Sequence, residues 1–162
     1  MKSKVLALIL LCGAASLGAK VKLPALVGDN MILQQQTEVK LWGTAAPEAE
    51  VRVTPSWNGQ TMTCRADKDG GWTLAVETPA AGYTPYEITF DDGEKTTLKN
   101  ILIGEVWLAS GQSNMEMPLK GFAGCCIMNG ADDIIVSAEN KGVRMFTVPK
   151  HQTYELQTDC KG

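Results

Sequence analysis

Ser113 lies in a setting that could support nucleophilic chemistry. It follows a turn, Ser110-Gly111-Gln112, that closes a near-continuous apolar run from Ile101 to Ala109. Such a run is typical of a strand buried on both faces of a parallel sheet, and Ser113–Glu116 has the pattern of a helix start. Ligands bind at the carboxyl ends of strands in open α/β sheets, where the N–H groups of a helix amino terminus stabilise a developing oxyanion. The pattern thus gives Ser113 the geometry that a serine nucleophile needs.

The same residues have a purely structural interpretation. Ser113 and Glu116 match a capping box, in which the serine caps the helix and the glutamate, three residues later, binds back to the cap. Capping boxes are far commoner than nucleophilic serines, so the pattern alone favours the cap.

A longer string around Ser113 changes this balance. Residues Gly104–Glu116, with the sequence GEVWLASGQSNME, closely resemble the first sequence block of the sialate O-acetylesterases. These are SGNH-type carbohydrate esterases whose Gly-Gln-Ser-Asn carries the nucleophile. The resemblance extends to Leu23–Gln35, Val39–Gly43 and Gly71-Trp72, which look like the β-domain that precedes the catalytic domain in bacterial members.

The resemblance implies a serine esterase without a metal or organic cofactor. Ser113 would attack the acetyl group of an O-acetylated sugar, expected to be sialic acid, and the N–H groups of Ser113 and Gln112 would stabilise the oxyanion. The family's base and acid lie in an Asp-x-x-His block that is missing here. The single histidine, His151, precedes Asp159 instead, so we expect it to be a solvated loop residue. The chain is therefore expected to be an amino-terminal fragment, inactive alone.

Two alternative functions stay open. Acetylxylan esterases share the Gly-Gln-Ser-Asn motif, so the acetylated sugar could be xylan. A non-catalytic carbohydrate-binding module could instead use Trp42, Trp57 and Trp72 to stack on sugars, although aromatic residues in a small sandwich are more often core.

The chain begins with the features of a secretory signal peptide. Lys2 and Lys4 precede an apolar run, Val5–Cys12, and small residues follow it. We expect cleavage after Ala19 and export to the periplasm or the extracellular space. No other segment is long and apolar enough to span a membrane. The net charge of −3 gives no electrostatic basis for binding nucleic acid or anionic membranes. The oligomeric state stays open.

Residues 20–100 have the pattern of an all-β sandwich or jelly roll. Short alternating segments rich in β-branched and aromatic residues are separated by Gly, Asp, Asn and Pro clusters. The predicted strands are Met31–Leu33, Val39–Trp42, Glu50–Val53, Met62–Arg65, Trp72–Val76 and Tyr86–Phe90. Their alternation indicates that one face of each sheet is wet.

Residues 101–162 are predicted to begin an α/β domain of the SGNH, flavodoxin-like type. A strand over Ile103–Ala109, a helix over Ala131–Glu139 and a strand over Val143–Val148 would form its first βαβ unit. Two strands cannot complete a doubly wound sheet, so this domain is expected to be incomplete. The predicted organisation is a signal peptide (1–19), a β-sandwich (20–100) and an incomplete hydrolase domain (101–162).

The sequence indicates no metal site. Asp67–Gly71 superficially resembles a calcium loop, but Thr78 stands where that loop requires glutamate, so we expect a hairpin turn before Trp72. The cysteines left after signal cleavage contain no Cys-x-x-Cys pair. Export permits a disulfide between Cys160 and either Cys125 or Cys126, which are adjacent to each other. Free thiols are an equal alternative. These cysteines are Cys64, Cys125, Cys126 and Cys160.

Overall fold

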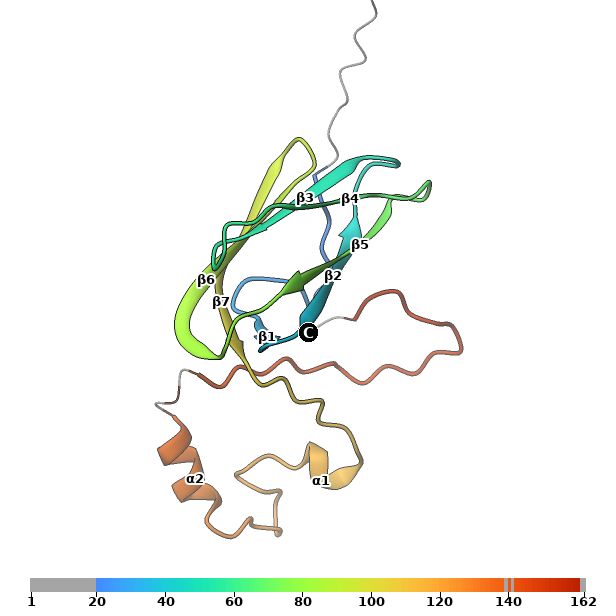
Figure 1. Ribbon diagram of the computed structural model, residues 1–162. Helices are drawn as coiled ribbons and strands as arrows, with labels where there is room; N and C mark the ends of the chain where they lie inside the picture. Colours follow the sequence, from blue (N-terminus) through green and yellow to red (C-terminus); the bar gives the residue numbers. More distant parts are fainter. Residues whose placement is uncertain (1–19, 139, 141, 161–162) are drawn as a thin grey trace, which may run out of the picture.

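The computed structural model describes residues 20–138, 140 and 142–160. The predicted signal peptide lies outside this range. Figure 1 shows a two-layered β structure, with two short helices beyond one end of it. The mostly β character expected from the sequence is confirmed.

Seven strands form between residues 20 and 104. Six lie close to predicted strands, whereas the seventh, Lys95–Gly104, overlaps only the start of a strand predicted for the next domain. In the strands Glu50–Pro55 and Gly71–Glu77 burial alternates along the chain, as the prediction of one wet face requires. The strands are β1 (Ile32–Gln34), β2 (Glu38–Thr44), β3 (Glu50–Pro55), β4 (Met62–Arg65), β5 (Gly71–Glu77), β6 (Gly82–Asp91) and β7 (Lys95–Gly104).

The strands form a five-stranded sheet in the order β1-β7-β6-β3-β4 and a two-stranded sheet of β2 and β5. All pairs are antiparallel except one. The edge strand β1 runs parallel to β7, with Ile32 opposite Leu102 and Gln34 opposite Gly104. This pairing places the end of β1 beside the point where the chain leaves the sandwich.

One apolar core lies between the two sheets. The larger sheet contributes Val51, Val53, Ile88 and Phe90, all fully buried. The smaller sheet supplies the opposite side of the core, including Leu41, Trp72 and Val76. Removal of these side chains from water is the main source of stability for such a sandwich.

Asp67–Gly71 forms a tight turn, but it is not the expected hairpin. The Asp67 carboxylate accepts hydrogen bonds from the N–H groups of Asp69 and Gly71, at 2.9 and 2.8 Å. The turn joins β4 of the larger sheet to β5 of the smaller one, so it passes between layers. Local turn chemistry was predictable, whereas the pairing partner of each strand was not.

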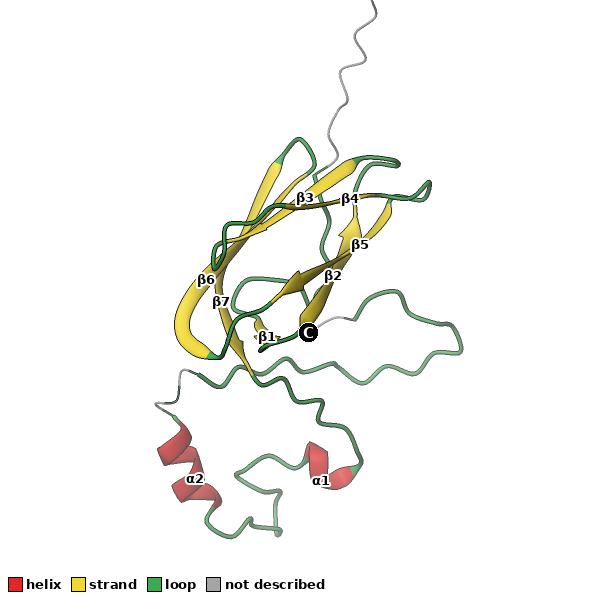
Figure 2. Cartoon of the chain, viewed as in Figure 1, coloured by secondary structure: helices red, strands yellow, loops and turns green. Residues whose placement is uncertain are grey.

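The predicted βαβ unit is not formed by the described residues. Strand β7 ends at Gly104, and Trp107 and Leu108 beyond it are 85% and 95% exposed. Residues 143–148 are extended without a ladder partner, as Figure 2 shows. An apolar run becomes a buried strand only where neighbours and covering layers exist, and β1 pairs with β7 no further than Gly104. Two helices do form, α1 (Ser113–Glu116) and α2 (Gly130–Ser137), close to their predicted positions.

Replacing Phe90 by alanine should destabilise the fold by about 3–5 kcal/mol, because a fully buried ring would leave a cavity. The ring also packs against Trp72, with 5.8 Å between ring centroids. Urea denaturation followed by tryptophan fluorescence measures the change. The matched control Tyr154→Ala, at a fully exposed ring, should change stability by less than about 0.5 kcal/mol. Equal effects of the two substitutions would contradict this assignment of the core.

Candidate functional site

Ser113 is the first residue of α1 and its side chain is exposed. The chain turns into the helix at Gln112, whose carbonyl accepts hydrogen bonds from the N–H groups of Met115 and Glu116, at 3.0 and 3.3 Å. Among the described residues, no group accepts a hydrogen bond from the N–H of Ser113 or Asn114. These two donors are therefore free to bind an anion. The helix has only four residues, so these N–H groups matter more than any helix dipole.

The capping box is not formed. The N-cap residue is Gln112 rather than Ser113, and no side-chain hydrogen bond caps the helix. Glu116 does not reach back either, because its carboxylate pairs with the ammonium group of Lys150. The Ser113 hydroxyl thus does not cap the helix.

Gly111 gives Met115 room to fold back over the turn. A Cβ atom at Gly111 would lie 2.7 Å from the Cγ atom of Met115. A larger residue would push this side chain away and change the entry into α1. The glycine of Gly-Gln-Ser-Asn therefore shapes the turn that presents Ser113.

The described residues do not complete a catalytic triad. His151 is exposed, and no hydrogen bond in this part of the chain joins it to Ser113 or to Asp159. Asp159 instead accepts a hydrogen bond from the N–H of Ala25, at 3.1 Å. The expectation that His151 is a solvated loop residue agrees with this exposure.

The chain enters the Ser113 region through a contact at Glu105. Its two carboxylate oxygens accept hydrogen bonds from the amide groups of Gln34 and Gln35, at 3.0 and 2.6 Å. These bonds hold the pKa of the Glu105 carboxyl below its ordinary value, with a small opposing effect from desolvation. The Gln34 amide oxygen also accepts the N–H of Val106, at 2.9 Å. The side chain of Glu105 and the backbone of Val106 are thereby both bound at the end of β1.

The chain returns to the sandwich through Arg144. The guanidinium group donates to the carbonyl of Met31 at 3.1 Å, to the carbonyl of Asn100, and to the Asn100 side-chain oxygen at 3.0 Å. Partial burial lowers the pKa of this guanidinium, which still stays charged at neutral pH. Sequence analysis did not single out Arg144 or Glu105, because their partners are 44 to 113 residues away. The one local signal is that Glu105 interrupts an apolar run.

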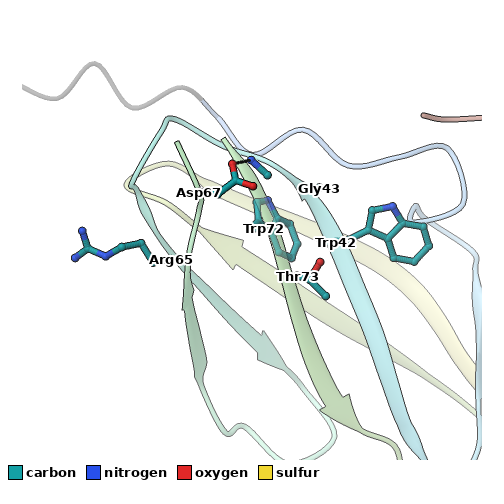
Figure 3. A pocket seen from close by; sticks show the side chains of 7 residues that line it. Trp42, Gly43, Arg65, Asp67, Trp72 and Thr73 are labelled. Carbon is teal, nitrogen blue, oxygen red and sulfur yellow. Dashed lines mark hydrogen bonds between the residues drawn. The ribbon is translucent and has the colours of Figure 1, made fainter. Parts of the chain in front are cut away.

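The three tryptophans do not form a shared platform. Trp72 is buried, and Trp57 is half-buried against Tyr86 with its indole N–H bonded to the carbonyl of Glu77. Trp42 alone is exposed, at 40%. It lines a shallow depression, shown in Figure 3, together with Gly43, Arg65, Asp67, Gly71, Trp72 and Thr73. The Trp42 ring points away from Trp72 in this view.

The four cysteines within the described residues are free thiols, with Cys125 and Cys126 exposed and Cys64 and Cys160 partly buried. Burial raises the pKa of the Cys64 thiol. The described residues contain no group of three or more His, Cys, Asp or Glu side chains placed to hold a metal ion. They also contain no helix of the length and hydropathy needed to span a membrane.

Known proteins similar to this chain are acetylesterases, although no family model matches it. Sialate O-acetylesterases from Rattus norvegicus, Mus musculus and Homo sapiens are 27%, 27% and 29% identical over 169, 165 and 161 residues. These alignments cover 97%, 96% and 92% of this chain. A solved structure of a carbohydrate acetylesterase from Xanthomonas citri has a TM-score of 0.75 and 32% identity over 88% of this chain.

Over most of its length this chain is therefore similar to proteins named as acetylesterases. Its expected resemblance to the sialate O-acetylesterases is confirmed, since proteins of that name match along nearly all of it. The chain spans about 30% of the length of these curated relatives and 31% of the solved structure.

Replacing Glu105 by glutamine should make thermal stability less dependent on pH. A lowered carboxyl pKa stabilises the fold above the unfolded-state pKa of about 4.3, and this contribution is lost as the pH falls through the lower, folded-state pKa. The Tm of the wild type should therefore fall more steeply than that of Glu105→Gln between about pH 5 and pH 2. Glu38→Gln, at an exposed glutamate on β2, serves as the control. Parallel Tm profiles for wild type and Glu105→Gln would contradict the contact.

Proposed function

We propose that the complete protein is a carbohydrate O-acetylesterase with Ser113 as its nucleophile. The observation that carries this proposal is the state of Ser113 in the Gly104–Glu116 block. Its hydroxyl is exposed and has no capping role, and its own N–H and that of Asn114 have no protein acceptor among the described residues. The acetylesterase relatives support the same chemistry.

The proposed reaction is an acyl transfer in two steps. The Ser113 oxygen bonds to the acetyl carbonyl carbon while its proton passes to a histidine base from elsewhere in the protein. The sugar oxygen leaves with that proton, and water then releases acetate from the acetyl-serine. The N–H of Ser113, with a contribution from Gln112, stabilises the negative oxygen of each tetrahedral intermediate. The exposed N–H of Asn114 is a further donor at the same turn.

The chain after β7, residues 105–162 of the region predicted as 101–162, is proposed to begin an α/β hydrolase domain that further strands and helices complete. The exposed apolar side chains of this region support the proposal, because soluble proteins rarely expose such large adjacent groups. Trp107 and Leu108 are adjacent and nearly fully exposed, and Met145 and Leu156 are 90% and 99% exposed. The separate β-sandwich domain would comprise residues 20–104, because β7 continues four residues past the boundary predicted after residue 100.

Sialic acid is the proposed substrate, because the similar curated proteins are named sialate O-acetylesterases. Export to the periplasm or the extracellular space is proposed from the signal-peptide pattern of residues 1–19. Extracellular glycans would be accessible there.

Ser113→Ala and Ser113→Gly in the complete protein should each abolish acetate release from 9-O-acetylated sialic acid. The expected loss is on the order of a million-fold, as for other serine hydrolases, since no other oxygen can take the acetyl group. The Tm should change little, because Ser113 is exposed and caps nothing.

The matched control is Ser137→Ala, which removes the exposed hydroxyl of a serine in α2 that bonds only to its own helix. It should keep full activity. Acetate release by a folded Ser113 variant would refute Ser113 as the nucleophile, whereas a wild-type protein that releases no acetate would favour the binding-module alternative. A protein that releases acetate only from acetylated xylan would refute the proposed substrate and keep the mechanism.

The 162-residue chain alone should hydrolyse no 4-nitrophenyl acetate above background. The reason is that Ser113 has no base among the described residues, so its hydroxyl keeps its proton at neutral pH. Release of 4-nitrophenol is followed by absorbance. Turnover that disappears on His151→Ala would show this expectation to be wrong and identify His151 as the base.

A further inference from the structure

The chain segment that precedes α1 and the one that follows α2 are attached to the same edge of the sandwich. The exit segment, residues 105–112, leaves β7 beside the end of β1. The return segment, residues 142–160, passes the beginning of β1. In Figure 1 it runs along the end of the sandwich where β1 and β7 lie.

The exit segment is fixed by hydrogen bonds to two consecutive residues at the end of β1. Gln34 and Gln35 each donate to one oxygen of the Glu105 carboxylate, and Gln34 also accepts the N–H of Val106. Hydrogen bonds to a charged acceptor are about twice as strong as neutral ones. Direction and position of the chain are thus both set before it reaches Ser113.

The return segment is fixed by the planar fork of Arg144. It donates to two backbone carbonyls, of Met31 just before β1 and of Asn100 in β7, and to the Asn100 side chain. The Asn100 side chain is itself held by Asn30, at 2.6 Å. A lysine could not reproduce this arrangement, because a single ammonium group lacks the fork geometry.

The return segment in turn holds α1, since Lys150 pairs with Glu116 in its last turn. Apolar packing does not hold α1 in place. No residue of α1 is buried, and none of the described residues after Ile103 belongs to the core. In the described part of the chain, the place of Ser113 relative to the sandwich therefore depends on polar contacts.

We propose that Glu105 and Arg144 are positioning residues that fasten the Ser113 helix to edge strand β1 from both sides. This inference rests on the proposed function for its catalytic consequence, but not for the contacts themselves. It assigns the sandwich a role in positioning, because β1 is then the attachment site that fixes the position of the nucleophile.

Hydrogen exchange on the chain tests the attachment through Glu105 and Arg144 without any activity measurement. In Glu105→Ala and Arg144→Ala, the hydrogen-bonded backbone N–H groups in residues 106–116, which are those of Val106, Met115 and Glu116, should exchange about two- to tenfold faster, the change expected for one lost hydrogen bond. Exchange in β3 and β6 should not change. The matched control, Glu50→Ala with Arg52→Ala, removes an exposed ion pair of 2.8 Å elsewhere on the sandwich and should leave residues 106–116 unchanged.

An exchange of roles between two side chains provides the rescue. In Gln34→Glu with Glu105→Gln, the carboxylate and the amide swap places, and every donor still meets an acceptor. In the double variant, residues 106–116 should exchange at the wild-type rate. In Arg144→Lys, by contrast, these residues should exchange as fast as in Arg144→Ala. Unchanged exchange in Glu105→Ala and Arg144→Ala, or no rescue by the swap, would overturn the proposal.

Kinetics of the complete protein then separate this inference from the proposed function. Arg144→Ala and Glu105→Ala should lower kcat by about ten- to a hundredfold with KM within about twofold, because a misplaced nucleophile slows the chemical step. Faster exchange in Glu105→Ala and Arg144→Ala, together with full activity of Ser113→Ala, would refute the esterase mechanism but support the attachment to β1. Faster exchange with an unchanged kcat, while Ser113→Ala is inactive, would refute the positioning role alone.

Discussion

The parallel pairing of β1 with β7 is the constraint on which the arrangement of this molecule depends. Parallel neighbours cannot be joined by a tight turn, so the whole of β2 to β6 forms the connection between them. The pairing is only three residues long, from Ile32 opposite Leu102 to Gln34 opposite Gly104. Because both strands run the same way, β1 ends where β7 releases the chain, and its side chains meet the exit segment there.

The two parts of the chain are stabilised by different interactions. The sandwich has an apolar core with fully buried residues such as Phe90 and Ile101. Beyond Gly104 the chain has no buried apolar cluster of its own among the described residues, and hydrogen bonds of Glu105, Arg144 and Asp159 join it to the sandwich. Exposed polar contacts of this kind are individually weak. The geometry at Ser113 is thus supported by several small interactions rather than by packing.

Ser113 illustrates how one residue pattern can carry two meanings. The spacing of Ser113 and Glu116 matches a capping box, yet Gln112 occupies the cap position and Glu116 binds Lys150. A capping box is a local motif, and it forms only where no distant partner competes for its side chains. The charge of Lys150, 34 residues away, is such a competitor. The serine is left exposed, as the proposed nucleophilic role requires.

The sequence by itself determined the local elements. Alternating apolar residues located six of the seven described strands, Met62–Arg65 to the residue, and the turn before Ser113 located α1. Strand β7 was missed, because a strand over Ile103–Ala109 was predicted for the following domain instead. Only the tertiary structure decided which strands pair, that Asp67–Gly71 crosses between sheets, and that the apolar run after Ile101 leaves the sheet at Gly104. The attachments at Glu105 and Arg144 were also invisible in the sequence. The physical reason is that periodicity records which face of an element is buried, whereas pairing and docking depend on partners far away in the chain.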